Sequence, residues 1–410
     1  MKVTITPGQA RGTVSAPPSK SMAHRMLMGA GLADGVSVIE NIELSEDIKA
    51  TLGILEALGG EYKFANRTVT MRGIGKIGIQ AKTVLDSKES GSTLRFFIPL
   101  VLTGGGDYEF TGAKRLFERP LGVYEDLCKE QGISFVKEET GLKVAGKLQA
   151  THYRIPGNIS SQFVTGLLYA LPLLSGDSVL EVLPPVESRA YIDMTLEALE
   201  TFGIVIKQDG DTFYIQGNQT YQANHVAVEG DYSNAAFLDA FNLIGGDVKV
   251  QGLRLDSLQG DRIYQKYYDV LKEPYPVMDL SECPDLGPIL IGMAAAGRGA
   301  RFTGTRRLKI KESDRGAVMA QELVKFGIRV EVYENEIIVY PGDLKKPVEN
   351  LCSHNDHRIA MTMATLCTIT GGVIEGAQSV RKSFPNYYEM IEDLGIQLTR
   401  EEDGGRESEL

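Results

Sequence analysis

The chain repeats itself at intervals of about 71 residues, and this repetition limits its possible folds more than any other feature. Six similar segments place a small polar cluster in front of an apolar helical pattern: SKSMAHRMLM at 19, SGSTLRFFIP at 90, SSQFVTGLLY at 160, DYSNAAFLDA at 231, PDLGPILIGM at 284 and NDHRIAMTMA at 355. Successive openings are 71, 70, 71, 53 and 71 residues apart. A longer match, FTGAKRL and FTGTRRL, recurs after 192 residues.

A common order of elements follows each opening. A Gly-rich turn, a strand-like run and a second helix ending in a Gly-Ile or Gly-Gly turn come next, and an alternating strand such as IRVEVY follows. The chain therefore predicts six copies of one helix–strand–helix–strand unit, the fourth shortened, in two halves of three. The halves should join near residues 222–230. Residues 1–12 precede the first unit and are expected to pair with the C-terminal half.

Composition narrows the class of protein. The 410 residues exceed a typical single domain, and the net charge of −11 argues against nucleic acid or an anionic membrane as partner. No apolar run reaches the roughly 18 residues of a membrane-spanning helix, and the first ten residues lack a signal-peptide pattern. Four cysteines and five histidines show no metal-ligand spacing. We expect a cytoplasmic protein without a metal.

Basic residues gather at the repeat openings of this acidic chain, where helix N-termini also attract anions. The cations at the openings are Lys20, Arg25, Arg95 and Arg358. Others follow the two FTG matches (Arg119, Lys311 and Arg315) or end a loop of the sixth unit (Lys382). Each alone is compatible with a solvated surface charge, but their recurrence at equivalent positions favours a site for phosphate and carboxylate groups. Two facing halves would then form a cleft for an anionic ligand.

The polar residues near these cations allow two interpretations. Ser160 and its neighbours fit either a helix cap or a phosphate site, and Asp285 fits either an N-cap or a base among cations. Glu312 fits either a partner of a helix dipole or a proton-transfer group. Asp231 and Asp356 are predicted to cap helices and orient their neighbours.

Nine segments in this order resemble the 5-enolpyruvylshikimate-3-phosphate synthases over essentially the whole chain: PPSKSMAHR, ESGSTLRF, FERP, SSQF, SRAYIDMTL, EGDYSNAA, KIKESDR, NDHR and RKSFPNYY. The related UDP-N-acetylglucosamine enolpyruvyl transferases fit less well. They lack the SKS and NDHR signatures and carry a reactive cysteine on a loop that has none here. A binding protein without catalysis is a third reading, disfavoured because both proton-transfer candidates are present.

The resemblance implies an α/β (α+β) fold, a two-domain inside-out α/β barrel of six βαβαββ repeats, three per domain. Residues 13–227 would form the N-terminal domain, and residues 1–12 with 228–410 the C-terminal domain, with the active site in the cleft between them. The reaction implied is transfer of the enolpyruvyl group of phosphoenolpyruvate to the 5-hydroxyl of shikimate 3-phosphate through a tetrahedral ketal. It uses no metal and no cofactor. We expect a monomer.

The resemblance also assigns residues. Shikimate 3-phosphate would contact Lys20, Ser21, Arg25, Ser160, Ser161, Gln162, Ser188, Tyr191, Asp285 and Lys311. Phosphoenolpyruvate would contact Lys20, Gly91, Arg119, Gln162, Arg315, Arg358 and Lys382. Asp285 would accept the hydroxyl proton, and Glu312 with Lys20 would serve the methylene carbon. Two positions depart from the family pattern: Glu89 replaces an asparagine beside the anionic substrate, and Arg307 stands where some members have an asparagine.

Overall fold

The computed structural model describes residues 1–402, apart from the side chains of residues 80 and 81; residues 403–410, the end of the expected C-terminal domain, lie outside the described part. The chain divides into two compact units. Unit 1 comprises Met1–Pro17, Gly230–Ser257 and Asp261–Leu410, and unit 2 comprises Pro18–Glu229 with Leu258–Gly260. These divisions fall a few residues after the predicted ones at 12/13 and 227/228.

Unit 2 contains three four-stranded sheets, one per repeat, with orders β14-β3-β5-β4, β6-β7-β9-β8 and β10-β11-β13-β12. The first repeat consists of α1 (Lys20–Leu32), β3 (Val36–Glu40), α2 (Glu46–Ala57), β4 (Glu61–Ala65), β5 (Thr68–Arg72) and β14 (His225–Ala227). The second consists of β6 (Gln80–Asp86), α3 (Gly91–Gly104), β7 (Gly106–Thr111), α4 (Lys114–Glu118), α5 (Gly122–Glu130), β8 (Ser134–Lys137) and β9 (Gly141–Ala145). The third consists of β10 (His152–Pro156), α6 (Ser161–Ala170), β11 (Ser178–Leu183), α7 (Arg189–Thr201), β12 (Ile206–Asp209) and β13 (Thr212–Ile215).

The three sheets share one topology. In the second repeat β6 runs parallel to β7, β7 pairs antiparallel with β9, and β8 and β9 form a hairpin. In the second and third repeats a helix connects the parallel pair and helical segments precede the hairpin, so each is a βαβαββ unit. In the first repeat the leading strand comes from the far end of the unit, since β14 pairs parallel with β3.

Unit 1 contains two four-stranded sheets, β16-β17-β19-β18 and β20-β21-β1-β22, and the two-stranded β15-β2. The fourth repeat consists of β2 (Arg11–Ser15), α8 (Tyr232–Leu243), β15 (Asp247–Gln251), the 3-10 helix η2 (Gly260–Ile263) and α9 (Tyr264–Val270). The fifth consists of β16 (Val277–Asp279), η3 (Pro284–Leu286), α10 (Gly287–Ala296), β17 (Ala300–Thr303), η4 (Arg306–Ile310), α11 (Arg315–Lys325), β18 (Val330–Val332) and β19 (Glu336–Val339). The sixth consists of β20 (Leu351–Cys352), α12 (His357–Thr370), β21 (Gly372–Glu375), η5 (Ala377–Lys382), α13 (Tyr387–Asp393), β22 (Leu398–Glu401) and β1 (Lys2–Ile5).

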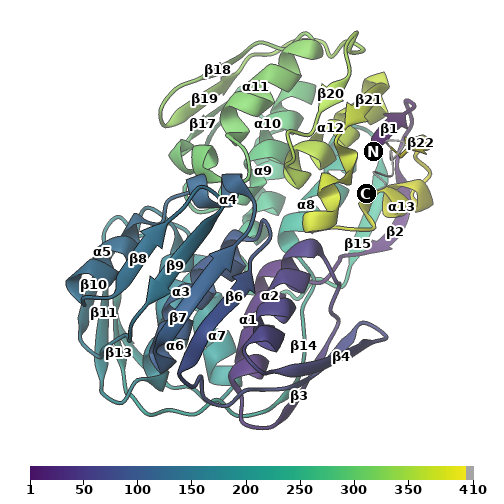
Figure 1. Ribbon diagram of the computed structural model, residues 1–410. Coiled ribbons are helices and arrows are strands. Elements are labelled where there is room, and N and C mark those ends of the chain that lie inside the picture. The colour runs from purple at the N-terminus through teal and green to yellow at the C-terminus, as the bar shows by residue number, and fades with distance from the viewer. Residues whose placement is uncertain (403–410) are drawn as a thin grey trace, which may run out of the picture. The chain divides into compact units, whose positions relative to one another are not determined.

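The fourth repeat is short because it lacks the strand hairpin, which agrees with its spacing of 53 residues. The N-terminal segment completes two repeats of unit 1. β1 lies between β21 and β22, antiparallel to both, and β2 pairs parallel with β15. Figure 1 shows purple β1 beside yellow β22, although they stand at opposite ends of the chain.

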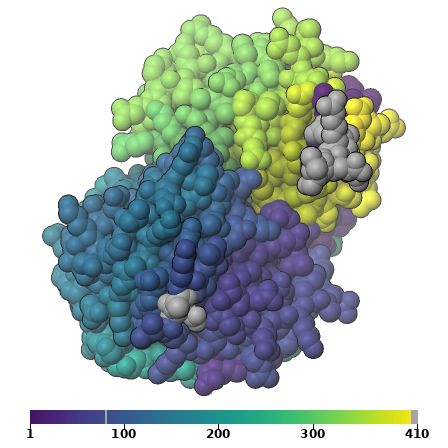
Figure 2. All heavy atoms as spheres, viewed as in Figure 1, coloured from purple at the N-terminus to yellow at the C-terminus, as the bar shows by residue number. Residues whose placement is uncertain are grey.

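Each unit has its own hydrophobic core around helices that are buried on all sides. In unit 1, α10 has no charged residue, and a β-carbon added at Gly292 would lie 2.4 Å from Cγ2 of Thr362 on α12. In unit 2, a β-carbon at Gly166 of α6 would lie 2.5 Å from the Arg95 carbonyl of α3. Small residues thus allow close helix contacts, and side chains cover the elements of each unit on the face shown in Figure 2. Within residues 1–402, no helix is long and apolar enough to cross a membrane.

Polar side chains cap most of the helices that open the repeats. Ser19, Ser90 and Ser160 accept from backbone N–H groups of α1, α3 and α6. Asp231 and Asp356 cap α8 and α12, which confirms their predicted role. The alternative that Asp285 is an N-cap is wrong, because Leu286 occupies that position of α10 without a side-chain bond. Asp285 lies in η3, so its carboxylate is available for other contacts.

Candidate active site

The first repeat of unit 2 places Lys20 beside an acidic partner. Lys20 is the first residue of α1, and its Nζ lies 2.8 Å from Oδ2 of Asp47 in the first turn of α2. Both side chains are about one-seventh exposed (15% and 13%). Asp47 therefore orients the lysine and restrains its long side chain at the surface of the unit.

Arg25 connects three helices. It is 3% exposed, and its guanidinium donates to the carbonyls of Ser21 (2.7 Å) and Tyr191 (2.8 Å) and to the hydroxyls of Thr195 (3.0 Å) and Thr165 (3.3 Å). Four of its five N–H groups are thus used within the protein. Burial lowers the pKa of Arg25 to about 10, which still leaves it charged at neutral pH. Arg25 brings Ser21 and Tyr191, two other candidate residues, to one place.

Gly91 and Arg119 are in direct contact. Gly91 begins α3, and Arg119 follows α4 and is 7% exposed. A β-carbon at residue 91 would lie 2.4 Å from Nη1 of Arg119, far inside van der Waals contact. The glycine is therefore needed for the guanidinium to occupy its present position.

The Gln162 amide is held at both ends. Its Oε1 accepts from Nη1 of Arg95 at 2.6 Å, and its Nε2 donates to Oγ of Ser92 at 3.0 Å. Arg95 also donates to the carbonyl of Pro120, the residue after Arg119, at 2.9 Å. One buried arginine thus fixes Gln162 and the backbone beside Arg119, a role that reasoning from the sequence missed.

The serine candidates lie at helix starts. The Ser160 hydroxyl accepts from the backbone N–H of Gln162, and Ser161 is the first residue of α6. Ser188 precedes α7 with φ of 57° and is fully buried. A left-handed serine is uncommon and strained, and such residues cluster at functional sites. This backbone conformation supports a functional role for Ser188.

In unit 1, three cations surround Asp285. Its carboxylate lies 2.9 Å from Nη1 of Arg315, 3.0 Å from Nζ of Lys311 and 3.4 Å from Nη2 of Arg358. The four residues come from η3, the end of η4, α11 and α12, so tertiary packing alone brings them together.

Arg315 links the carboxylates of this cluster. Its side chain is 1% exposed and also donates to Oε2 of Glu312 at 2.8 Å and to Oδ2 of Asp356 at 2.9 Å. Asp356 is fully buried and additionally accepts from the hydroxyl of Ser313 at 3.0 Å. It therefore orients Arg315 while capping α12; the sequence predicted that Asp356 orients its neighbours but did not reveal this partner.

The charges perturb one another. Burial alone would raise the pKa of Asp285, but Lys311, Arg358 and Arg315 hold it well below its ordinary value. Burial lowers the pKa of Lys311 to about 8, against the opposing effect of Asp285. Asp261, 3% exposed, has a pKa raised to about 6 by burial and by the nearby charge of Asp285. Perturbed groups of this kind mark candidate catalytic sites.

Lys382 joins the cluster indirectly. It is the last residue of η5, 8% exposed, and its Nζ donates to the carbonyl of Asn355 at 2.6 Å. Asn355 adjoins Asp356, the partner of Arg315. Asp285 therefore forms one cluster with four other candidates of unit 1, and the sixth candidate, Lys382, is attached through the neighbouring loop.

The two positions that depart from the family pattern are also located. Glu89 is half-buried and immediately precedes Ser90, the cap of α3. Arg307 is 6% exposed in η4 and lies close enough to Lys311 to lower its pKa. Its Nη1 lies 3.4 Å from the carbonyl of Ser281.

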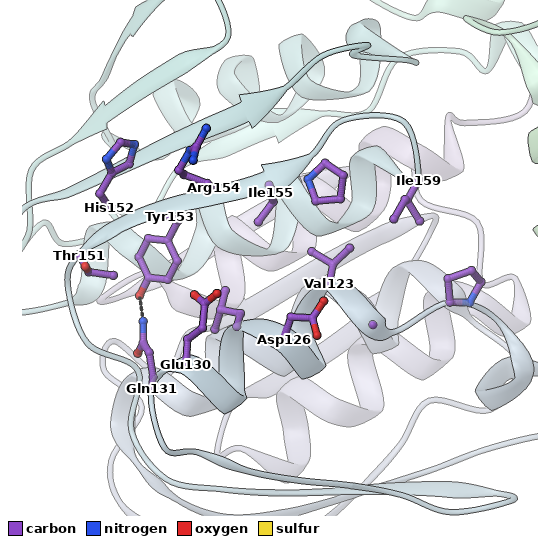
Figure 3. Close-up of a pocket in the computed structure, with 14 residues that line it drawn as sticks. Val123, Asp126, Glu130, Gln131, Thr151, His152, Tyr153, Arg154, Ile155 and Ile159 are labelled. Atoms are coloured by element: carbon purple, nitrogen blue, oxygen red, sulfur yellow. Dashed lines mark hydrogen bonds between the residues drawn. The ribbon is translucent and has the colours of Figure 1, made fainter.

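Unit 2 also has a groove that is lined by other residues than the candidate site residues. It has a volume of about 540 Å³ and runs between α5 and β10 (Figure 3). Asp126 and Glu130 line it together with His152 and Arg154, and Gln131 donates to the Tyr153 hydroxyl at 3.1 Å. Arg154 is engaged by Glu181 at 3.1 Å. The lining holds none of the candidate residues, and its mixed charges do not suit a dianionic ligand.

Comparison with known proteins gives one family. The model of the EPSP synthase (3-phosphoshikimate 1-carboxyvinyltransferase) family matches residues 5–391. The 3-phosphoshikimate 1-carboxyvinyltransferase of Clostridium kluyveri is 41% identical over 97% of this chain and 98% of its own, and that of Clostridium novyi is 38% identical over 96% and 97%. An EPSP synthase structure from Acinetobacter baumannii covers 98% of this chain and 100% of its own with a TM-score of 0.76 at 22% identity, which shows the shared two-domain α/β fold. The chain therefore belongs to the EPSP synthase family.

Proposed function

We propose that the candidate residues of the two units act together on the substrates of this family. The chain is an enolpyruvyl transferase, which transfers the enolpyruvyl group of phosphoenolpyruvate to the 5-hydroxyl of shikimate 3-phosphate and releases inorganic phosphate. The observation that carries the residue assignment is the carboxylate of Asp285 held by Lys311, Arg315 and Arg358. Such a cluster supplies both a base and the cations that an anionic substrate needs.

Shikimate 3-phosphate is assigned mainly to unit 2. Its phosphate would be bound by the hydroxyls of Ser160, Ser161 and Ser188, with hydroxyl and cationic contacts from Ser21, Lys20 and Arg25 and the ring of Tyr191 nearby. The positions of these serines at the starts of α6 and α7 support this, since the positive end of a helix dipole favours anions. Lys311 and Asp285 of unit 1 would contact the same substrate.

Phosphoenolpyruvate is assigned to cations of both units. Arg315, Arg358 and Lys382 would bind it from unit 1, and Lys20 and Arg119 from unit 2, with Gly91 and Gln162 beside them. Three of these five cations, Arg119, Arg315 and Arg358, are at most 7% exposed and oriented by protein contacts or by Gly91. Preorganised cations stabilise charge that develops in a transition state more effectively than mobile ones.

Each of the two carboxylates, Asp285 and Glu312, is assigned one proton transfer. Asp285 would take the 5-hydroxyl proton while the oxygen attacks C2 of phosphoenolpyruvate, and Glu312 with Lys20 would protonate C3. The ketal would then lose a C3 proton and phosphate. In the unliganded unit the three cations outweigh burial and lower the pKa of Asp285, which weakens the carboxylate as a base. Phosphoenolpyruvate would compete for the same cations, which would raise the pKa of Asp285 when the substrate is bound.

The assignment uses no metal ion and no organic cofactor. A monomeric state, a cytoplasmic location and the lack of a nucleic-acid partner are also part of the proposal. Light scattering of the purified protein at several concentrations tests the monomer, since a concentration-dependent mass would contradict it.

Phosphate release tests the function directly. Phosphoenolpyruvate is supplied with shikimate 3-phosphate, with UDP-N-acetylglucosamine or with neither acceptor. Release only with shikimate 3-phosphate is expected. Release only with the nucleotide sugar would favour the related transferases, and no release from folded protein would favour a binding protein.

Asp285→Asn tests the assigned base. The amide keeps the size of the side chain but cannot accept the hydroxyl proton, so kcat should fall by about 10²–10⁴. Asp269→Asn, at an exposed carboxylate paired with Lys272, is the matched control. An unchanged kcat in Asp285→Asn would remove Asp285 from the mechanism.

A further inference from the structure

The loop between β20 and α12 has an unusual backbone. His354 and Asn355 both adopt left-handed conformations, with φ of 49° and 55°. Two consecutive non-glycine residues of this kind are strained unless the surroundings hold them, and such strain is found where a protein fixes functional groups. Residues 353–356, which end with the first two residues of the NDHR segment (355–358), are called the NDHR loop.

Two groups of the NDHR loop contact side chains that are proposed to bind phosphoenolpyruvate. The carbonyl of Asn355 accepts from Nζ of Lys382 at 2.6 Å. The carboxylate of Asp356 accepts from Nε of Arg315 at 2.9 Å. The position of this loop therefore sets the positions of both cations.

A buried carboxylate outside the proposed chemistry holds the loop from the other side. Glu322 on α11 is 1% exposed. It accepts from Nε2 of His354 at 2.8 Å and from the backbone N–H of Cys352 at 3.0 Å. Its third partner is Nζ of Lys325 at 2.8 Å, which also donates to the carbonyl of Asn350 at 3.0 Å. Glu322 thus ties α11 to both the strand before the loop and the loop itself.

One helix therefore holds the loop at two points. Arg315 begins α11 and Glu322 lies seven residues later, which is two helical turns and the same face. Arg315 contacts Asp356 at one end of the loop, and Glu322 contacts Cys352 and His354 at the other. Such a two-point attachment to a rigid element accounts for the strained backbone between the contacts.

We propose that Glu322 and His354 are positioning residues for phosphoenolpyruvate binding. Their contact keeps the NDHR loop in its left-handed turn, and the turn places Asp356 against Arg315 and the Asn355 carbonyl against Lys382. This inference rests on the proposed function of Arg315 and Lys382. It differs from a purely stabilising role, because loosening the loop should weaken the binding of phosphoenolpyruvate and leave the binding of shikimate 3-phosphate unchanged.

Two variants remove the contact in different ways. His354→Asn keeps a residue type that tolerates a left-handed backbone but is too short to reach Glu322. Glu322→Gln keeps the size of the side chain and leaves one oxygen for three donors. His225→Asn is the matched control, since His225 also contacts a glutamate (Glu40, 2.7 Å) but in an exposed pair that includes no candidate residue.

The measurement is phosphate release with each substrate varied in turn, together with the thermal midpoint. In both loop variants the KM for phosphoenolpyruvate should rise on the order of tenfold, as expected for a displacement of binding groups by a fraction of an ångström. The KM for shikimate 3-phosphate should stay within about twofold, because most of its proposed ligands lie in unit 2. The control should change neither KM.

Other outcomes overturn the inference. Unchanged KM values, or equal rises for both substrates, would leave Glu322 and His354 only a role in stability. If Glu322→Gln does not fold, His354→Asn decides alone, since its side chain is already 28% exposed. Failure of the proposed function is distinguishable, because the wild-type protein would then release no phosphate with shikimate 3-phosphate.

Discussion

Single residues of the candidate site show how burial and charge act on each other. Lys311 is close to Asp285, yet its pKa is lowered to about 8 because burial and the charges of Arg307 and Arg315 outweigh the carboxylate. The residue types at these positions could be predicted from the sequence because they match a family pattern. Their pKa values could not, because they depend on neighbours that only packing supplies.

Lys311 should make shikimate 3-phosphate binding sensitive to alkaline pH. Above about pH 8 the lysine loses its charge, so kcat/KM for this substrate should fall. The effect on stability has the opposite sign. Between the lowered pKa of about 8 and the ordinary value of 10.5, the folded state binds fewer protons than the unfolded state, so the cost of burying this lysine shrinks as pH rises. A pH profile of kcat/KM checks the first effect.

Lys311→Arg should move the alkaline limb upwards, because a guanidinium stays charged. Lys309→Arg, at an exposed lysine of the same segment, is the control. An alkaline limb that is unchanged by Lys311→Arg would assign the titration to another group.

Gly91→Ala should weaken phosphoenolpyruvate binding while the protein stays folded. The new β-carbon would lie 2.4 Å from Nη1 of Arg119, and the flexible guanidinium would move away. The KM for phosphoenolpyruvate should rise by roughly 10–100-fold, in the range for misplaced binding groups. Gly122→Ala, where a β-carbon meets nothing within 4 Å, is the control. An unchanged KM would show that Arg119 does not bind this substrate from its present position.

At the scale of elements, buried polar side chains set how the helices of a repeat meet. The N-caps at Ser19, Ser90 and Ser160 could be predicted because a cap is local in sequence. The contact of Arg25 with α6 and α7 joins residues up to 170 positions apart, and no local pattern indicates it. The same holds for Arg95 and Gln162.

Arg25→Lys should lower stability as well as shikimate 3-phosphate binding. Lysine cannot reproduce the planar fork, so buried carbonyl and hydroxyl partners would be left unsatisfied at about 1–3 kcal/mol each. The thermal midpoint and the KM should both change. Arg67→Lys, at an exposed arginine bound to Asn41, is the control. A raised KM with an unchanged midpoint would mean that Arg25 serves the substrate alone.

At the scale of the whole molecule, the repeats are closed by strands from distant parts of the chain. β14 completes the first repeat within unit 2, so residues 18–229 contain every strand of that unit. Unit 1 instead needs β1 and β2 from the start of the chain. β1 lies inside its sheet, where both edges of the strand are paired.

A fragment of residues 18–229 should therefore fold alone, whereas residues 230–410 should not. Circular dichroism and cooperative thermal unfolding measure both. The control joins residue 402 through a short linker to residues 1–17, since Lys2 pairs with Glu401 and the two ends are adjacent. This permuted unit 1 should fold. A stable fragment 230–410 without β1 would contradict the importance of the crossing strands.

The sequence by itself determined the repeats, the short fourth unit, the caps and the family, because each is written in local pattern or in the order of motifs. The tertiary structure alone decided which charges meet. Asp47 holds Lys20, Asp356 holds Arg315, and Glu322 holds the NDHR loop. These pairs join different helices and loops, and their distances depend on how whole elements pack, which residue spacing does not encode.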